Sequence, residues 1–396
     1  MKPQLYLYAL PPFAFGTSAY VFAGLLDPMA ADLGSSVPLV AQLQTVFAIA
    51  CAIGSPLLAR ITTGFDRRTL LVAVLILLAA ANAVAALATG YSTLVAARIV
   101  GGFVGALATP VSSMMAVMIA PPERRAAALA IVVAGNTIAF IFGVPVGSVI
   151  GDAFGWRGTF WFATAICVVV ACVMRAGTSS TGRAPSPPED AFKRATTSQN
   201  IHLFVVTLLG FVATFCSIAF IGPIVTDTTG IDGREIGAMQ LMVGVGSILG
   251  LYVGTKLSST SARLSICVLF AVIVSAQLAY VAAFAITSAH VSIFIVASAI
   301  CLGAAALFAM TPIVQVRLAQ NAGDAATIAF ALNGSMIFLG QGLGAAVGGV
   351  VAESAQLHYV SFAGALVAIL GFFVALRLPQ VSRAKSSVGG LGVASD

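Results

Sequence analysis

The chain has 396 residues, of which 60% are hydrophobic and only 8% are charged, and its mean hydropathy is +1.05. Soluble domains carry roughly 25% charged residues, so this composition excludes a water-soluble globular protein. The net charge of +6 does not indicate nucleic-acid binding, because the cations fall in short segments between long apolar runs.

Apolar windows of about 20 residues, the length that a helix needs to cross a bilayer, occur at twelve places. We predict an all-α membrane protein with 12 transmembrane helices in two pseudo-symmetric six-helix bundles, at 1–174 and 201–377. A polar cytoplasmic linker is expected at 175–200, and a disordered cytoplasmic tail at 378–396. The predicted spans are 5–26, 38–59, 69–90, 94–117, 126–150, 158–174, 201–225, 236–255, 264–287, 289–313, 326–351 and 357–376.

Lysine and arginine are distributed unevenly among the loops. If the N-terminus is cytoplasmic, every one of the 19 cations except Arg98, Arg157 and Arg234 falls on the cytoplasmic side. This is the bias that the positive-inside rule describes. We therefore expect both termini in the cytoplasm and the chain in the cytoplasmic membrane, the inner membrane of a bacterial cell.

The end of the first span carries polar residues. The segment Gly16–Gly34 reads GTSAYVFAGLLDPMAADLG, with Tyr20 in apolar sequence and Asp27 directly before Pro28. It resembles the first helix of the drug and sugar efflux branch of the major facilitator superfamily, related to exporters of arabinose polymers and chloramphenicol. Members of that branch often have a carboxylate where this chain has Ala19, which leaves Asp27 as the proton-coupling candidate. The alternative is that Asp27 is a solvated residue at a helix end.

The loop after the second span, Ala59–Leu71, reads ARITTGFDRRTLL. It resembles the loop between helices two and three of the same superfamily, where the pattern is close to G-x-L-x-D-R-x-G-R-R. Arg67 and Arg68 match the final arginine pair, which implies a gating role. Thr63 stands where the acidic residue is usual and Gly64 where an arginine is expected, so the charge relay of this loop is incomplete. The alternative is that the arginines only fix topology and contact lipid phosphates.

The fourth span contains a single cation, Arg98, followed by Gly101, Gly102 and Gly105. This arrangement resembles the R-x-x-x-G motif of the superfamily's fourth helix. An arginine at membrane depth costs at least ~2.5 kcal/mol on insertion scales, so we expect Arg98 to face the bundle interior and the transport pathway. The alternative is that Arg98 lies near the outer end of the helix and snorkels to the interface.

The segment Gly143–Trp161, which starts within the fifth span, reads GVPVGSVIGDAFGWRGTFW. Gly143, Gly147 and Gly151 form one smooth helix face, and Pro145 removes a backbone hydrogen bond and bends the helix. The segment resembles the helix-five motif of drug-efflux antiporters, which implies export. We expect the small face to pack closely against another helix as a gating surface, with ordinary small-residue packing as the alternative.

Part of the fifth span recurs in the eleventh, 197 positions later. A shift of almost half the chain indicates that the two bundles derive from one unit, as in many secondary transporters. The recurring residues are Gly143, Gly147, Gly151 and Asn136, which match Gly340, Gly344, Gly348 and Asn333.

By the resemblance, helices one, four, seven and ten line the pathway, assisted by two, five, eight and eleven. Gln42 and Gln44 point to different faces of one helix, and the sequence does not say which of them faces the pathway. With so few charges, the pathway should prefer neutral or amphipathic molecules. The polar residues expected along it, besides Arg98, are Tyr20, Gln42, Gln44, Asn136, Gln240, Asn333 and Gln341.

These resemblances predict the major facilitator fold and a secondary active transporter that exports a drug, sugar or metabolite by alternating access, coupled to proton antiport. Uptake or facilitated diffusion is the alternative within transport. An intramembrane enzyme is disfavoured because His202, His290 and His358 lie far apart at predicted span ends. No catalytic residue, metal, cofactor or nucleic acid is expected. The expected partners are the substrate, protons and the lipid bilayer, with the protein as a monomer.

Overall fold

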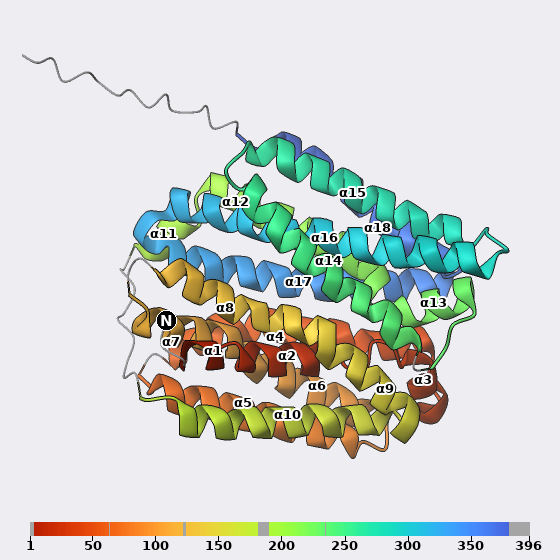
Figure 1. The fold of residues 1–396 in the computed structure, drawn as a ribbon, viewed down its shortest axis with the longest axis horizontal. Helices are drawn as coiled ribbons and strands as arrows, with labels where there is room; N and C mark the ends of the chain where they lie inside the picture. Colours follow the sequence, from red (N-terminus) through yellow and green to blue (C-terminus); the bar gives the residue numbers. More distant parts are fainter. Residues whose placement is uncertain (1–3, 63, 122–123, 181–189, 234, 380–396) are drawn as a thin grey trace, which may run out of the picture.

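The computed structural model describes residues 4–62, 64–121, 124–180, 190–233 and 235–379, and all structural statements below concern these residues. The regular elements found there are helices (Figure 1). The all-α architecture is therefore confirmed. The predicted tail at 378–396 lies almost wholly outside the described residues, as does the middle of the linker.

The helices of the first half follow one another through short connections. A π-helical turn, Ala139–Gly143, joins α8 to α9. The helices are α1 (Gln4–Leu7), α2 (Leu10–Tyr20), α3 (Leu26–Leu33), α4 (Val37–Ile61), α5 (Arg67–Ala86), α6 (Tyr91–Gly105), α7 (Ala108–Ile119), α8 (Arg125–Ile138), α9 (Val144–Phe154) and α10 (Trp156–Gly177).

The second half repeats this plan after the linker. A short 3-10 turn, Gly323–Ala325, separates its two longest helices. The helices are α11 (Ala191–Ala195), α12 (Ser198–Ile218), α13 (Ile221–Thr229), α14 (Glu235–Leu257), α15 (Ala262–Ala283), α16 (Ala289–Ala322), α17 (Ala326–Ser354) and α18 (His358–Leu376).

Eleven helical stretches are long and apolar enough to cross a membrane among the residues searched, and they coincide with predicted spans two to twelve. The first predicted span, 5–26, was wrong as a single helix, because it is divided into α1, α2 and α3. The seventh, 201–225, was wrong in the same way, because it is divided between α12 and α13. The helix breaks after Tyr20 and restarts at Leu26. Pro28 falls in the first turn of α3, where its missing N–H leaves no helical hydrogen bond unmade.

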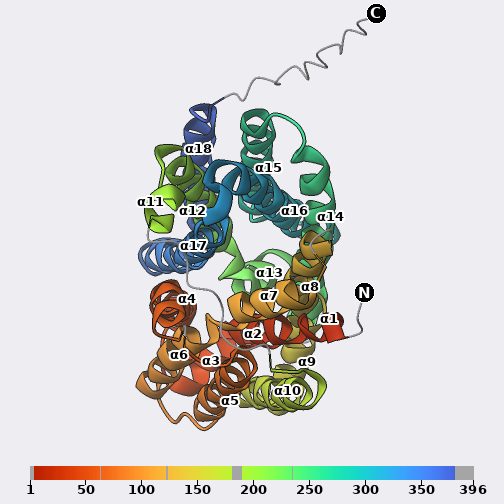
Figure 2. The same cartoon turned by 90° about the vertical axis from the view of Figure 1, so that its left-hand side faces the viewer.

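The two halves lie one above the other with their long helices roughly side by side (Figure 1). They meet along two seams, one between α4 and α17 and the other between α14 and the α8–α9 segment (Figure 2). Helix α11 lies at one end of the molecule, which we call the linker end. The short helices α3 and α13 contact each other at the opposite end (Figure 1).

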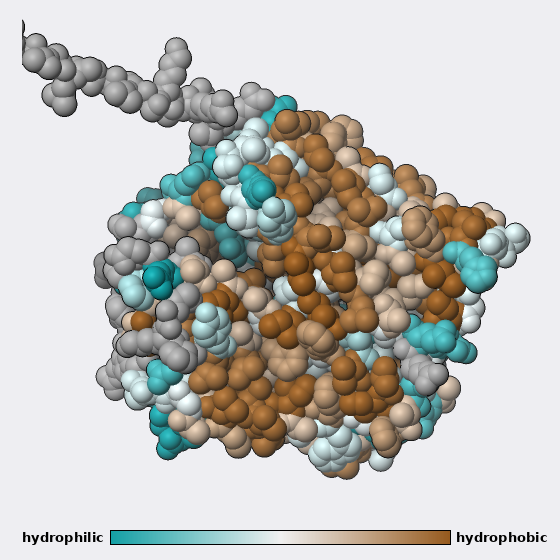
Figure 3. Space-filling model, in the orientation of Figure 1, coloured by the Kyte–Doolittle hydropathy of each residue, from teal (hydrophilic) through white to brown (hydrophobic). Residues whose placement is uncertain are grey.

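Large apolar side chains cover the face of the molecule between its two ends, whereas hydrophilic residues gather at those ends (Figure 3). Ile248 and Leu249 on α14 and Phe142 in the π-helical turn are about half exposed. An apolar surface of this extent is unfavourable in water and matches the hydrocarbon core of a bilayer. The fold is that of a multi-pass membrane protein.

The recurring glycines pack within each half. Gly143, Gly147 and Gly151 lie so close to Thr17, Val21 and Leu25, respectively, that an added Cβ atom would overlap these side chains. The small face of the fifth span is thus covered by the first span of the same half.

The second half contains the same contact between α17 and α12. A Cβ atom added at Gly344 would lie 2.6 Å from the carbonyl oxygen of Val212, and one at Gly348 would lie 2.7 Å from that of Cys216. In both halves the glycines let the divided span, the first or the seventh, approach its neighbour closely.

Candidate functional site

The break in the first span leaves backbone carbonyls that a continuous helix would satisfy. Beyond the break the N–H of Ala23 donates to Tyr20 rather than to Ala19. Arg98 on α6 fills the gap, because its Nη1 and Nη2 atoms each lie 2.8 Å from the carbonyl oxygens of Ser18 and Ala19, respectively. The guanidinium thus acts as a cap for the end of α2.

Arg98 is only 2% exposed, so it does not snorkel to an interface. Its guanidinium carbon lies 3.9 Å from the ring centre of Phe47 and 4.9 Å from that of Phe22. The thiol of Cys51, next to this group, donates to the carbonyl oxygen of Gly102. Among the described residues Arg98 forms no ion pair. Carbonyl dipoles and aromatic rings therefore stabilise this buried positive charge.

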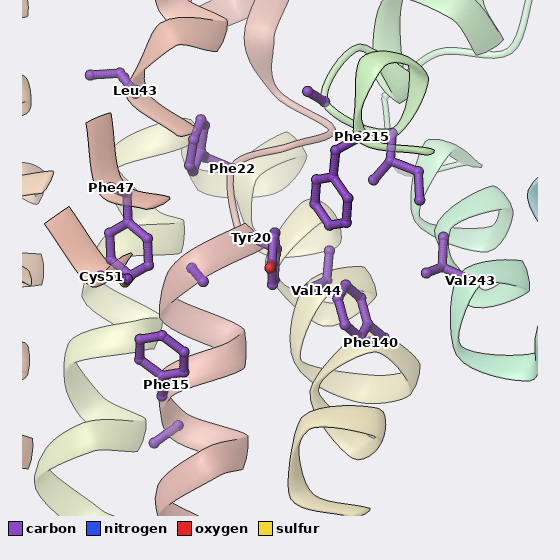
Figure 4. Close-up of a cluster of buried hydrophobic side chains, with 14 of the residues drawn as sticks. Phe15, Tyr20, Phe22, Leu43, Phe47, Cys51, Phe140, Val144, Phe215 and Val243 are labelled. Atoms are coloured by element: carbon purple, nitrogen blue, oxygen red, sulfur yellow. The ribbon is translucent and has the colours of Figure 1, made fainter. Parts of the chain in front are cut away.

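Aromatic rings from both halves surround Tyr20 (Figure 4). Its ring centre lies 4.9 Å from that of Phe140 in the first half and 5.9 Å from that of Phe215 in the second. Phe15 contacts Phe47 at 5.8 Å and reaches Phe338 on α17 at 5.7 Å. The centre of the molecule is thus an aromatic contact between the two halves.

A small hollow lies beside Tyr20, between the first span, α4 and α12. Gln44 lines it, is 5% exposed, and has a side-chain nitrogen without a hydrogen-bond partner in the described part of the chain. Gln42 instead faces Gly349 in the seam between α4 and α17. The structure thus places Gln44, and not Gln42, toward the centre. The hollow is lined by Tyr20, Phe22, Leu26, Gln44, Phe215 and Ile218, with Ala23, Ala41 and Ala219 between them.

Two more of the predicted glutamines lie close to the broken first span. Ser148 on α9 donates to Oε1 of Gln240 on α14 over 2.6 Å, a hydrogen bond that joins the two halves. The nitrogen of Gln240 has no partner among the described residues, and it lies against Gly24. Gln341 on α17 interacts with the hydroxyl of Tyr20. Polar groups of both halves therefore converge on the break.

The two asparagines related by the sequence repeat have different surroundings. Asn333 accepts a hydrogen bond of 2.8 Å from Thr207 and lines a second small hollow, which shares no residue with the first. The oxygen of Asn136 lies against Gly16 on α2. Neither asparagine lines the hollow beside Tyr20.

Asp27 is exposed in the first turn of α3, beyond the first predicted span. Partial desolvation and the negative charge of Asp227 on α13 raise the pKa of its carboxyl group above the ordinary value. Asp227, rather than Arg98, is thus the charged residue that acts on Asp27.

The arginines after α4 bind backbone carbonyls. Arg67 is 4% exposed and donates to the carbonyl oxygen of Thr62 over 3.1 Å. Arg68 donates over 2.7 Å to that of Thr178, just after α10. The loop between α4 and α5 is thereby tied to the start of the linker.

Asp66 was not among the residues predicted from the sequence. Its carboxylate accepts from the backbone N–H of Thr69, which caps α5, and it also accepts from the hydroxyl of Ser180. An aspartate directly before a helix is a recognisable cap, so the sequence contained this signal. Thr63, the position where the family pattern has its acidic residue, lies outside the described residues.

Two buried polar clusters lie away from the predicted pathway residues. Asn82 on α5 donates to the hydroxyl of Ser18 over 2.9 Å, just before the first span breaks. In the second half, Ser217 donates to Gln277 on α15 over 2.6 Å and lies 2.9 Å from Ser361. Each cluster ties α2 or α12 to the outer helices of its own half.

The chain matches the family model of the Major Facilitator Superfamily over residues 12–329. It is 30% identical to the uncharacterized MFS-type transporter YtbD of Bacillus subtilis, over 93% of each chain. It is 35% identical to the chloramphenicol resistance protein of Streptomyces lividans, over 65% of this chain and 67% of that one. The inner membrane transport protein YdhP of Escherichia coli is 29% identical over 94% and 96% of the two chains.

Solved structures show the same fold. A bacterial homolog of the human lysosomal transporter Spinster, in an inward-facing and unoccupied conformation, superimposes with a TM-score of 0.73 at 17% identity, over 97% of this chain and 100% of that one. The occupied form of that homolog gives a TM-score of 0.75 at the same identity, over 96% and 98%. The family match and the fold identify the chain as a member of the major facilitator superfamily, and therefore as a membrane transporter rather than an enzyme.

Proposed function

We propose that this transporter exports a small neutral or amphipathic organic molecule across the cytoplasmic membrane by alternating access. The observation that carries the proposal is the hollow between the halves, where Tyr20, Gln44 and Phe215 lie together. Such a position lets a bound molecule contact both halves, so that their relative movement exposes it to one side and then to the other.

Export is favoured over uptake by two observations. The segment that resembles the helix-five motif of efflux antiporters has its glycines packed against the broken first helix, beside the hollow. One of the relatives is a chloramphenicol resistance protein, a name consistent with removal of a drug from the cell. We assign the transport pathway to Tyr20, Gln44 and Arg98, with Gln240 and Gln341 at the break, and gating roles to the glycine face and the Arg67–Arg68 pair.

For energy coupling we propose proton antiport through Asp27. Its raised pKa brings the carboxyl group closer to working pH, and its helix contacts the equivalent short helix of the other half. We further propose that the protein acts as a monomer, with bundles at 1–174 and 201–377 and both termini in the cytoplasm of a bacterial cell. In that orientation Asp27 lies at the outer side of the membrane, where it is accessible to external protons.

The test is transport in sealed everted membrane vesicles with a panel of candidate compounds, with and without an imposed pH gradient. Gradient-driven accumulation that is lost in Asp27→Asn, while downhill exchange remains, supports proton-coupled export, because the amide mimics the protonated carboxyl group. If Asp27→Asn accumulates substrate like the wild type, Asp27 is not the coupling site. If the wild type only equilibrates its substrate, the protein is a facilitator.

A further inference from the structure

A chain of aromatic rings crosses the centre of the molecule from one half to the other. Phe308 on α16 contacts Phe140 in the π-helical turn, with ring centres 5.8 Å apart. Phe140 contacts Tyr20 at 4.9 Å, and Tyr20 contacts Phe215 on α12 at 5.9 Å (Figure 4). Phe211, one helical turn from Phe215, continues the series at 6.1 Å. We call these five residues the ring chain, and it passes between the halves twice.

Two small polar hollows border the ring chain at different levels along α12. The hollow beside Tyr20 and Phe215 contains Gln44, whose side-chain nitrogen has no partner in the described part of the chain. The other hollow lies against Phe211, nearer the linker end of α12, and three polar side chains line it. They are Thr207, Thr311 and Asn333. Phe211 lines one hollow and Phe215 the other, so the contact between their rings marks the boundary between the hollows.

Each hollow has room for about one water molecule and offers it polar side chains as hydrogen-bond partners. The layer between them is different in character, because the side chains of Phe140, Phe211 and Phe215 are apolar and no more than 8% exposed. Water is unfavourable in an apolar constriction of this kind, and a hydrogen-bonded chain of water molecules cannot pass through contacting rings. The ring chain therefore interrupts the path between two sites that suit water.

We propose that the ring chain is the permeability barrier of this protein, a dry layer that keeps the two hydrated hollows apart and so prevents protons from leaking across the membrane. Because Phe140 and Phe215 belong to different halves, the barrier is complete only while the halves are in contact at the centre. This inference does not rest on the proposed export, because a leak of protons is measured without any substrate.

Loss of one ring should join the two hollows. A cavity lined only by apolar side chains stays dry, whereas a cavity that reaches polar groups fills with water. Phe140→Ala and Phe215→Ala each open space beside Tyr20, whose hydroxyl interacts with Gln341. Gln44 and its unpartnered nitrogen line the adjoining hollow. The new space is therefore bordered by polar groups, and we expect it to be hydrated.

The experiment measures passive proton flux through the purified full chain in liposomes that contain a pH-sensitive dye. A potassium gradient with valinomycin sets an inside-negative potential, which draws protons inward, and no substrate is added. We expect the wild type to acidify the interior no faster than protein-free liposomes do. Phe140→Ala and Phe215→Ala should acidify it at least about tenfold faster than the wild type, which corresponds to about 1.4 kcal/mol off the barrier.

Two further variants separate the barrier from a general effect of the substitution. Phe142→Ala removes the same ring two residues away in the same π-helical turn, where the side chain is 60% exposed on the outer surface, and should remain as tight as the wild type. Phe140→Leu keeps apolar bulk in the layer and should leak much less than Phe140→Ala, because a filled apolar layer still excludes water. All proteins are compared as monodisperse samples.

Three outcomes would overturn the inference. They are a wild type that conducts protons well above the protein-free level, monodisperse Phe140→Ala and Phe215→Ala proteins that are both as tight as the wild type, and a Phe142→Ala protein that leaks as fast as Phe140→Ala. The wild-type measurement tests the barrier even where a variant fails to fold. A tight wild type that exports no compound would contradict the proposed export and leave the barrier intact.

Discussion

Arg98 and Ser18, which are 80 positions apart in the chain, are joined by a hydrogen bond of 2.8 Å from the guanidinium to the backbone carbonyl oxygen. A second bond of the same length reaches Ala19. Arg98→Met keeps an unbranched apolar stem but removes the guanidinium and leaves two buried carbonyls unpaired, at about 1–3 kcal/mol for each. We expect a clear drop in the thermal unfolding midpoint in detergent, and a smaller drop for Arg98→Lys. The control is Arg175→Met, at an exposed position on α10, which should leave the midpoint unchanged. Equal midpoints for Arg98→Met and the wild type would contradict the capping role.

The glycine contact between α17 and α12 gives a second prediction. In Gly344→Ala, the new Cβ atom would lie 2.6 Å from the Val212 carbonyl oxygen, so the backbones must separate. We expect a loss of about 1–3 kcal/mol of stability, as for other overpacked interiors. Gly334→Ala on the same helix has no atom within 4 Å of the added carbon and should be neutral or slightly stabilising. Equal unfolding midpoints for the two variants would contradict this prediction, because they would mean that α12 moves away from the added Cβ atom at little cost in stability.

The ion pair between Asp32 and Arg157 predicts a pH dependence. Hydrogen bonds from Arg157 at 2.7 Å and from Trp156 at 3.2 Å lower the pKa of the Asp32 carboxyl group. The pair therefore stabilises the folded state above the unfolded-state pKa of about 3.9, and this stabilisation is lost as the pH falls through the lowered value.

Asp32→Asn should accordingly lower the thermal unfolding midpoint at pH 7 and have no effect near pH 2. The difference should shrink in high salt, because both side chains are partly exposed. Glu353→Gln changes an exposed carboxylate for which the described residues show no ion pair, and serves as the control. A deficit of Asp32→Asn that is the same at both pH values would exclude the ion pair as its cause.

The proximity of Asp27 and Asp227 predicts a shift in the pH profile of transport. Asp227 raises the pKa of Asp27 through its negative charge, so Asp227→Asn should lower that pKa toward its ordinary value. If Asp27 is the coupling group, the external pH for half-maximal transport should move to lower pH in Asp227→Asn. Asp232→Asn, at another position near the same end, should leave the profile in place. If Asp227→Asn leaves the pH profile of transport unchanged, the Asp27–Asp227 pair does not set the pH dependence of proton coupling.

The proposed orientation predicts which loops an impermeant thiol reagent reaches in intact cells. In a background without native cysteines, Arg194→Cys in the linker should resist labelling, whereas Asp232→Cys at the opposite end should react. Both positions are exposed, so a difference in labelling reports the side of the membrane and not burial. Labelling of both at the same rate would contradict the orientation.

The positions of the spans follow from the sequence because hydropathy is a local property, and the long apolar helices needed no knowledge of their neighbours. The break between Tyr20 and Leu26 was missed because Val21 to Leu25 are all apolar or glycine, so no polar signal interrupts the window. Arg98 caps the broken end, but its acceptors are backbone carbonyls, which have no signature in the sequence.

The site was partly predictable for a similar reason. Tyr20 and Arg98 were found because polar residues at membrane depth are rare. The choice between Gln42 and Gln44 was not predictable, because it depends on how α4 is rotated against α17, where Gly349 leaves room for Gln42. Asn82 and Gln277 were visible as polar residues within spans, but their serine partners lie on other helices.

The offset between corresponding residues of the two halves is constant for the recurring glycines but differs between the buried polar clusters. Gly143, Gly147 and Gly151 have their counterparts 197 positions later, whereas Ser18 and Ser217 are offset by 199 and Asn82 and Gln277 by 195. Insertions and deletions have thus accumulated in the connections between helices. No change of length has survived between Gly143 and Gly151 or between Gly340 and Gly348, where one added residue would rotate the whole helix and turn its bare face away from its partner.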